Sequence, residues 1–322
     1  MRGAAGCDRL ARILLSDQNR AGEPSSAVTI FLNARAGSGH AGRRVPEVRA
    51  AFRKLNFAVR LMETYSPEQL RREARAKIAE GSAILAAMGG DGTLQLLARE
   101  ALGGKTAIGV IPAGGGNDFA AALGIPSWQE AVRAIAGGRT KLVDAVKVRF
   151  ENGQEGRYFG GGGAGLDAEA ALYAGGRFRS WPGRLRYIAA AIAALGKDPS
   201  ADFEVTSGAG NAPEFSGRAL FAAALNTPSY GGGVRLAPDA IMDDGLVDFV
   251  VLERLTPLEI LGLLPRLWLK GQLTTKRVKR FRAASARVTA AVPVRFHGDG
   301  ELLGTTPVSI EVEPKALKIL VP

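Results

Sequence analysis

Two glycine-rich stretches with acidic and amide side chains could bind phosphate groups. MGGDGTLQ, residues 88–95, follows an apolar run and precedes leucine and alanine residues at helical spacing, and PAGGGNDFA, residues 112–120, has the same arrangement. A tight strand-to-helix turn directs backbone N–H groups and the positive end of the helix dipole at an anion. One such turn is also an ordinary βα connection with Thr93 as the helix N-cap. Two of them at the same edge of one sheet favour a phosphate site.

A third stretch, HGDGELL at residues 297–303, offers two carboxylates for acid–base chemistry. A carboxylate beside a hydroxyl can accept its proton while a phosphoryl group is transferred. Asp299 and Glu301 are two residues apart, so on a strand both would face the same side, and Gly298 and Gly300 leave room for a substrate. The alternative is a hairpin turn, because Asp-Gly between two apolar runs is typical of one.

The N-terminal half must supply the strands that end at the glycine turns. Apolar strands alternate there with helical patterns, and Ser66 followed by Pro67 marks a helix start. The expected strands cover residues 27–33, 57–64, 82–88 and 106–112, and the expected helices cover residues 37–55, 66–81, 94–102 and 119–124. This alternation predicts a three-layer α/β domain with a parallel sheet. Ligands bind such sheets at the carboxyl ends of the strands, where Asn33, Thr64 and both glycine turns fall.

From about residue 143 the pattern of the sequence changes. Strand-like segments separated by glycine, proline and asparagine turns are interrupted by two helical patches, at residues 167–195 and 256–269. This pattern predicts a mainly antiparallel, β-sandwich-like domain. We expect a flexible tail over residues 1–27, an α/β domain over 28–143 and a β-rich domain over 144–322.

Composition limits the possible functions. The chain has 322 residues, 46% of them hydrophobic, and a net charge of +11, which suits a globular protein that binds nucleic acid, anionic membrane or phosphate-bearing substrates. Its single cysteine, Cys7, and its two histidines, His40 and His297, argue against a disulfide framework and a histidine-based metal site. No secretory signal is evident, and the longest apolar run, residues 187–195, is too short to span a bilayer. We expect a cytoplasmic protein whose membrane contact is peripheral.

The two glycine turns together resemble the catalytic domain of the diacylglycerol kinase family, in its bacterial lipid-kinase branch. That family has a GGDG[ST] turn and a P-x-G-T-x-N-D-[FL]-A turn. FLNARAGSG (31–39) is similar to its opening strand and turn, SYGGGVRLAPDAIMDDGLVDFVVL (229–252) to its G-G-G and D-G-x-L-D segment, and residues 298–322 to its closing D-G-E segment. The resemblance covers nearly the whole chain. Ala34, Gly115 and Gly161 depart from the family's usual Pro, Thr and Asn.

The resemblance implies an ATP site along the strand ends of the first domain. Gly115 stands where the family usually has a threonine, so the contact that the threonine hydroxyl would make with the nucleotide is not expected here. The matching positions are Asn33, Ala34, Arg35, Ala36, Gly37, Thr64, Gly89, Gly90, Asp91, Gly92, Thr93, Gly114, Gly115, Gly116, Asn117 and Asp118.

The resemblance also implies Mg²⁺ and a proton acceptor. Asp244 and the backbone carbonyls of Ile241 and Leu246 match an Mg²⁺ site of mainly structural role, and oxygen ligands suit this ion; a D-D-G turn between strands is the alternative. Glu301 matches the family's proton acceptor, and Asp299 is the acid of the same motif. The implied reaction transfers the γ-phosphoryl group of Mg-ATP to a lipid hydroxyl, with diacylglycerol as the default acceptor and the inner face of the membrane as the place. A homodimer stays open.

Two other functions share some of these features. NAD kinase and some phosphofructokinases, which act on soluble substrates, have a GGDGT-type turn, but PAGGGND and GDGE fit the lipid branch better. A nucleotide- or lipid-binding protein without turnover is disfavoured by the intact Asp299 and Glu301. GGGGAG, residues 160–165, satisfies a dinucleotide fingerprint, but no acid lies between Glu169 and Asp198, so we expect a glycine-rich turn.

Two basic aromatic stretches, residues 176–187 and 267–282, could dock on anionic lipid. A solvated face of alternating strand residues is the alternative. Nucleic-acid binding is disfavoured, because the chain shows no recognised nucleic-acid module.

Overall fold

The structure is a computed structural model that describes residues 26–322 apart from 179, 180, 182, 197, 209–211, 257, 261, 264–270, 272 and 274. The predicted tail over residues 1–27 lies outside the described residues except for its last two. Most of the predicted helical patch at 256–269 also lies outside them.

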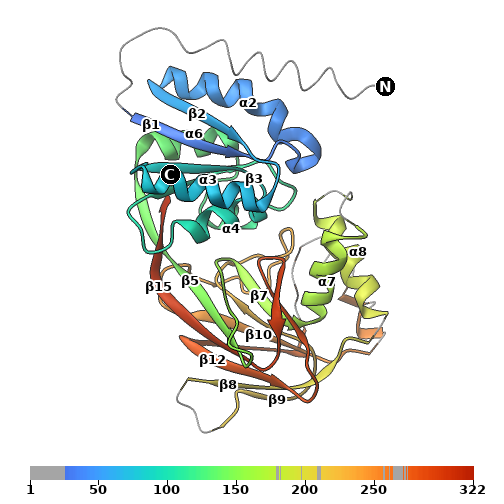
Figure 1. Ribbon diagram of the computed structural model, residues 1–322. Coiled ribbons are helices and arrows are strands. Elements are labelled where there is room, and N and C mark those ends of the chain that lie inside the picture. Colours follow the sequence, from blue (N-terminus) through green and yellow to red (C-terminus); the bar gives the residue numbers. More distant parts are fainter. Residues whose placement is uncertain are drawn as a thin grey trace.

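The first lobe is the predicted three-layer α/β domain (Figure 1). Its strands are all parallel in the order β4-β3-β1-β2, with α2 and α6 on one face and α3 and α4 on the other. The strands are β1 (Ser26–Leu32), β2 (Phe57–Glu63), β3 (Ile84–Gly89) and β4 (Ala107–Pro112), and the helices are α2 (Ala36–Lys54), α3 (Pro67–Ala79), α4 (Asp91–Glu100), α5 (Asp118–Ala122) and α6 (Trp128–Gly137).

Local sequence explains most of these boundaries. The Ser66 side chain accepts the Gln69 N–H at 3.1 Å and Pro67 opens α3, as predicted. Helix α6 was not predicted; Ser127 caps it in the same way through Glu130, and its apolar side is buried against β4.

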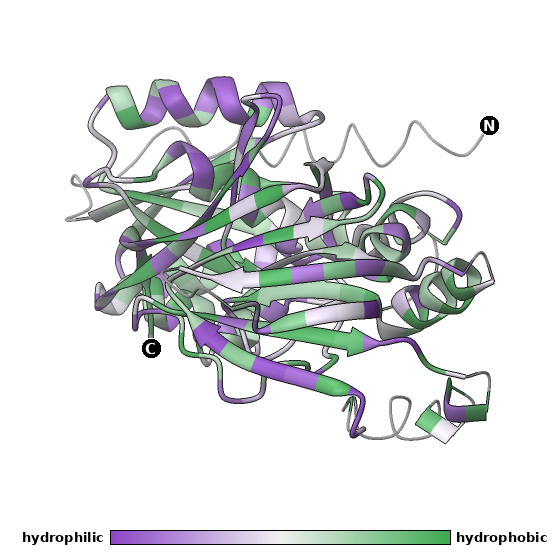
Figure 2. Ribbon diagram, turned by 90° about the horizontal axis from the view of Figure 1, so that it is seen from below, coloured by the Kyte–Doolittle hydropathy of each residue, from purple (hydrophilic) through white to green (hydrophobic). Residues whose placement is uncertain are grey.

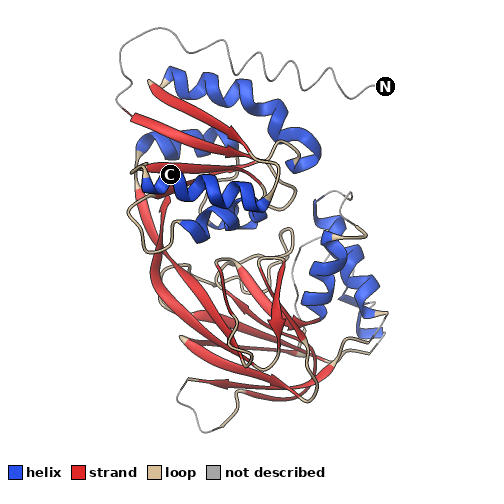
Figure 3. Ribbon diagram, viewed as in Figure 1, coloured by secondary structure: helices blue, strands red, loops and turns tan. Residues whose placement is uncertain are grey.

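The second lobe is mainly antiparallel, as predicted, with α7 and α8 packed together along one side (Figure 3). In β8, Ala201, Phe203 and Val205 are buried and alternate with exposed acids, which is the pattern of a sheet with one face in the core. Alternating hydrophilic and hydrophobic residues are visible along several strands in Figure 2. The elements are β5 (Thr140–Phe150), β6 (Glu155–Tyr158), β7 (Gly161–Gly165), α7 (Leu166–Gly175), α8 (Gly183–Leu195), β8 (Ala201–Ser207), β9 (Phe215–Leu225), β10 (Val247–Glu253), β11 (Val278–Ala283), β12 (Ser285–Ala290), β13 (Arg295–Gly298), β14 (Glu301–Thr305) and β15 (Val308–Leu320).

The last strand joins the two lobes (Figure 1). β15 runs antiparallel to β5 along both lobes and pairs in parallel with β4 through Ile319 and Ile108, so the two lobes share one continuous sheet. Leu317 and Ile319 are packed in the core of the first lobe. The domain boundary between residues 143 and 144 stays a prediction. The C-terminal end of β15 adds a strand to the sheet of the first lobe, which the order of the sequence did not indicate.

The GGGGAG segment is a buried strand and not the expected glycine-rich turn. Gly161–Gly165 form β7, which pairs with β9 on one side and β13 on the other. A Cβ on Gly162 would lie 2.6 Å from the His297 carbonyl oxygen, and one on Gly163 would lie 2.1 Å from Asp167 Oδ2. Glycine is therefore required here because neighbouring groups approach the backbone closely.

Candidate active site

The first glycine turn is shorter than expected. Helix α4 begins at Asp91 with Gly90 as its N-cap, so Thr93 is a buried residue of the first helical turn and not the cap. The Thr93 hydroxyl lies 3.4 Å from the Asn33 amide nitrogen, and the Asn33 N–H donates to the Met88 carbonyl at 3.1 Å. The end of β1 and the first glycine turn are thereby held together, as predicted.

Asp91 ties the two glycine turns to each other. Its partly buried carboxylate accepts the N–H groups of Asn117 at 2.9 Å and Phe119 at 3.3 Å. Burial, followed by the nearby Asp118 carboxylate, raises the pKa of Asp91 to about 6. The sequence placed this carboxylate toward a nucleotide; the structure places it against the backbone of the second turn.

The second glycine turn is packed tightly onto the first. Asn117 has a left-handed backbone (φ 58°), and its side chain bonds both the N–H and the carbonyl of Gly114. A Cβ on Gly114 would lie 2.4 Å from Gly90 Cα, so the two turns can approach only as glycines. This contact fixes the spacing of the two sets of backbone N–H groups.

Asp118 connects the second turn to the other lobe. Its carboxylate accepts the Ser229 hydroxyl at 3.1 Å and the Gly232 N–H at 2.7 Å, both from the glycine-rich loop at residues 226–234. The predicted G-G-G segment and the predicted N-D pair therefore meet across the lobes.

The D-G-E segment is a hairpin turn, and the expectation that both acids face the same side is wrong. Asp299 (φ 52°) and Gly300 (φ 85°) form the turn between β13 and β14, and only Glu301 lies in a strand. Left-handed residues at both central positions are typical of two-residue hairpin loops. The alternative weighed from the sequence, a hairpin, is thus correct for the backbone.

The two acids of the hairpin have different environments. Asp299 is partly buried and accepts the N–H groups of Phe159, Gly160 and Gly161 at 2.7–3.1 Å, and desolvation by its surroundings raises its pKa. The half-exposed Glu301 pairs with Arg99 of α4 at 2.5 Å. Arg99 also donates to the Arg157 carbonyl, and its Nη2 atom is buried with no partner among the described residues.

A chain of hydrogen bonds joins the hairpin to the glycine turns. The backbone at residues 159–161 binds Asp299 through its N–H groups and the side chains of Asn226 and Thr227 through its carbonyls. The same loop continues to the Ser229 and Gly232 contacts with Asp118. Asp299 is close enough to Asp91 to contribute to its raised pKa. Segments 200 residues apart therefore form one site.

A cleft of about 1260 Å³ opens at the strand ends, between the first lobe and the segment that joins α7 and α8. Eight of the predicted nucleotide-binding residues line it: Asn33, Arg35, Ala36, Gly37, Thr64, Thr93, Gly114 and Gly115. The remaining eight do not line it: Ala34, Gly89, Gly90, Asp91, Gly92, Gly116, Asn117 and Asp118.

Sequence reasoning missed several arginines of this site. Arg44, Arg177 and Arg186 line the cleft, and Arg99 reaches Glu301. Arg177 and Arg186 belong to a stretch that the sequence associated with membrane docking. Arg99 follows the GGDGT turn on the same helix, which was the only signal for it.

The predicted Mg²⁺ ligand Asp244 has other partners in the structure. Its carboxylate pairs with Arg282 and accepts the Leu246 N–H, and the adjacent Asp243 pairs with Lys141. Among the described residues, no group of three or more His, Cys, Asp or Glu side chains is arranged to hold a metal ion. The site of Ile241, Asp244 and Leu246 stays a prediction.

The second basic stretch is largely paired within the protein. Arg277 pairs with Glu253 and Glu259, Arg282 pairs with two aspartates, and Arg280 donates to two backbone carbonyls. Trp268 and Lys270 lie outside the described residues. None of the helices described is long and apolar enough to cross a membrane.

Two family models match the chain. Residues 27–148 match the diacylglycerol kinase catalytic domain, and residues 160–321 match the YegS C-terminal NAD kinase beta sandwich-like domain. A diacylglycerol kinase of Mycobacterium tuberculosis strain H37Rv is 30% identical over 251 residues, which are 77% of this chain and 79% of that protein. A probable lipid kinase YegS-like of Pseudomonas aeruginosa strain PAO1 is 30% identical over 285 residues, 86% of this chain and 90% of that protein.

Solved structures show the same fold. The crystal structure of a putative diacylglycerol kinase from Bacillus anthracis superposes with a TM-score of 0.70 at 17% identity, and the match covers 94% of this chain and 99% of that chain. With two family models along its length and relatives at 30% identity, the chain belongs to the diacylglycerol kinase family, among the lipid kinases that include the YegS-like proteins.

Proposed function

We propose that the protein is a kinase that transfers the γ-phosphoryl group of Mg-ATP to the free hydroxyl of diacylglycerol, giving phosphatidic acid. The observation that carries this proposal is the hydrogen-bonded path from the glycine turns to the D-G-E hairpin, because it joins a phosphate-binding edge to a carboxylate base. Family membership supports lipid-kinase activity in general. The name of the M. tuberculosis relative makes diacylglycerol the first acceptor to test.

ATP would lie in the cleft, with its phosphates at the two glycine turns. Backbone N–H groups at a helix start favour an anion, and phosphoryl transfer depends mainly on positioning and charge neutralisation. Arg35, Arg44, Arg177 and Arg186 line the same cleft and would neutralise phosphate charge. Arg177 and Arg186 then serve the nucleotide, which is a different role from membrane docking.

Mg²⁺ would enter bound to the phosphates of the nucleotide, because no group of three acids among the described residues is arranged to hold the ion by itself. Asp118 and Asp299 both raise the pKa of Asp91, so a divalent cation near these carboxylates would relieve the repulsion between their charges. Carboxylate and phosphate oxygens are the ligands that Mg²⁺ prefers. When bound, the ion supplies charge neutralisation of the transferring group. The separate site at Asp244 would require Arg282 to give up its ion pair.

Glu301 would accept the proton of the lipid hydroxyl. Its carboxylate is held by Arg99 at 2.5 Å, and Arg99 stands on the helix that begins at the first glycine turn. Asp299 would position the hairpin through its three backbone hydrogen bonds and would not itself take the proton. Glu301, on β14, is thus tied through Arg99 to the helix whose first turn belongs to the phosphate-binding edge.

We further propose that the enzyme works in the cytoplasm, at the inner face of the membrane, with residues 28–143 as its nucleotide domain and 144–322 as its lipid domain. Diacylglycerol resides in the bilayer, so the enzyme must approach that surface. The net charge of +11 would favour an anionic leaflet.

The test is incubation of the purified protein with γ-labelled ATP, Mg²⁺ and a panel of lipids, followed by separation of the products. We expect label in phosphatidic acid when diacylglycerol is present, and none without Mg²⁺. Label in another lipid would show that the acceptor is that lipid and not diacylglycerol, and that the protein is still a lipid kinase. Label only in a soluble acceptor such as NAD, or in none of the acceptors, would contradict the proposal.

A further inference from the structure

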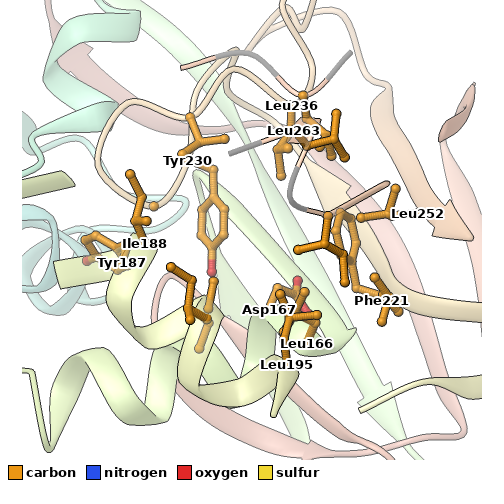
Figure 4. A pocket seen from close by; sticks show the side chains of 18 of the residues that line it. Leu166, Asp167, Tyr187, Ile188, Leu195, Phe221, Tyr230, Leu236, Leu252 and Leu263 are labelled. Atoms are coloured by element: carbon orange, nitrogen blue, oxygen red, sulfur yellow. The ribbon is translucent and has the colours of Figure 1, made fainter. Parts of the chain in front are cut away.

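An apolar pocket lies in the second lobe, outside the cleft, between α7–α8 and the strands β9 and β10 (Figure 4). Its walls are aliphatic and aromatic side chains, among them Leu166, Ile188, Leu195, Phe221 and Leu252. Among the described residues of the lining, Asp167 is the only charged one, and Tyr187 and Tyr230 are the only others with a polar side chain. A bound water needs two to four polar partners, so most of this described lining does not suit water. The pocket therefore suits hydrocarbon better than water.

One end of the pocket adjoins the candidate active site. Tyr187 and Tyr230 line that end together with Gly231, where a Cβ would lie 3.8 Å from the Tyr187 ring (Figure 4). Gly231 sits between Tyr230 and Gly232, whose N–H binds Asp118 of the second glycine turn. Burial raises the pKa of Tyr187; Arg186 opposes this rise, and the nearby Asp91 and Asp118 add to it. The apolar pocket and the acidic cluster thus meet at this loop.

We propose that this pocket holds one alkyl chain of the lipid acceptor, with the tyrosine end toward the reacting hydroxyl; the assignment rests on the function proposed above. The pocket volume of about 170 Å³ is close to that of an apolar cavity of about 150 Å³ that stays dry and binds benzene, so the pocket has room for a segment of about six carbons of one chain. The enzyme then selects its lipid by one chain and leaves the other outside the pocket.

The test fills the pocket from α8. Ala191 lines the pocket and Ala193, on the same helix and also half-buried, does not, so Ala191→Phe and Ala193→Phe form a matched pair. The probe is 11-(dansylamino)undecanoic acid, whose fluorescence rises in an apolar site. We expect equal affinity in wild type and Ala193→Phe, and an affinity at least tenfold lower in Ala191→Phe. Ala170→Leu, from α7, is the second pocket variant should Ala191→Phe not fold.

A kinetic arm separates this proposal from the proposed function. With dibutyryl-, dihexanoyl- and dioctanoylglycerol below their micelle concentrations, the wild-type KM should fall about fourfold for each methylene that enters the pocket. Ala191→Phe should flatten this dependence. If the wild type phosphorylates these lipids and the pocket variants keep its chain-length dependence, the pocket assignment is overturned while the kinase stands. If the wild type phosphorylates none of these lipids, the proposed function fails. Independently of activity, the pocket assignment is overturned if the pocket variants bind the fluorescent probe as tightly as the wild type does.

A second, independent observation concerns the buried His297 of β13. Its Nδ1 accepts the Gly300 N–H at 3.3 Å, and its Nε2 faces the Tyr230 hydroxyl at 2.8 Å and Asp167 Oδ2 at 3.3 Å. Because Nδ1 is used as an acceptor, the neutral ring carries its proton on Nε2. The ring thereby connects the fixed Asp167 to the amide between Asp299 and Glu301.

We infer that His297 is a positioning residue that fixes the D-G-E turn through the Gly300 amide. His297→Asn keeps an acceptor near Nδ1, and His297→Gln keeps a polar group near Nε2. If His297 only fills space, the glutamine variant should keep more activity, because glutamine is closer to histidine in size. If His297 acts through Gly300, the asparagine variant should keep more activity. We expect the second result: kcat falls about 10- to 100-fold in His297→Gln and much less in His297→Asn, with the KM for ATP unchanged in both.

Equal losses in the two variants, or a better glutamine variant, would overturn this role. Amide exchange in the wild type gives a readout that needs no variant. The Gly300 N–H should exchange slowly for a residue in a hairpin turn, and exchange as fast as in an exposed loop would also overturn the inference.

Discussion

Glu301→Gln should lower the rate of lipid phosphorylation at least 10²-fold and leave the affinity for ATP nearly unchanged. Glutamine has the shape of glutamate and can still accept a hydrogen bond from Arg99, but its amide cannot take the proton of a hydroxyl. The base acts on the acceptor lipid and not on the nucleotide. Steady-state kcat with diacylglycerol and direct binding of ATP measure the two effects separately.

The matched control is Glu313→Gln. Glu313 forms a comparable pair with Arg157 at 2.7 Å, outside the candidate site. Breaking that pair should cost little activity, because a half-exposed ion pair contributes at most about 1 kcal/mol to stability. A wild-type rate in Glu301→Gln would place the base elsewhere, and equal losses in both variants would mean that the ion pair matters and not the proton transfer.

Much of the fold follows from local sequence. The alternation of apolar strands with helical patterns fixed the three-layer first lobe, and Ser66–Pro67 marked the start of α3 because both capping signals act within one helical turn. Position in the chain could not reveal that β15 completes the first sheet through Ile319 and Ile108, because that pairing spans more than 200 residues. Nor could it reveal that Gly161–Gly165 form a strand, because the close approach comes from His297 and Asp167.

In the candidate site, too, some features could be predicted from the sequence and others could not. The types of residue were visible as motifs, and the structure gathers Asp91, Asp118 and Asp299 into one network as the motifs implied. Side-chain direction was not visible: Asp91 turns to the Asn117 and Phe119 amides, and Asp299 lies in a turn with a left-handed backbone. Both depend on contacts between segments that the sequence keeps far apart.

Above its pKa, the ionised Asp91 carboxylate lowers the free energy of unfolding, although we expect the kinase activity to require it. Folding raises this pKa from an ordinary 3.8 to about 6, so between these values the folded state binds more protons than the unfolded state. The free energy of unfolding therefore falls as pH rises through this window, and above pH 6 the ionised buried carboxylate costs on the order of 3 kcal/mol. Asparagine does not titrate and avoids this cost. It can accept only one of the two backbone N–H groups, which is a penalty independent of pH.

Asp91→Asn should therefore lose kinase activity at least 10²-fold, since the spacing of the glycine turns and the charge beside the phosphates both change. Over the same pH range, from 4 to 7, the stability of the variant relative to wild type should rise by about 2–3 kcal/mol in chemical denaturation. The control is Asp198→Asn, where Ser200 and Arg254 lower the pKa of the exposed carboxyl, so its titration lies below this window and the relative stability should stay nearly flat from pH 4 to 7. Full activity in Asp91→Asn would make the turn purely structural, and a stability difference that is flat with pH would mean that the ionised carboxylate is already compensated in the folded protein.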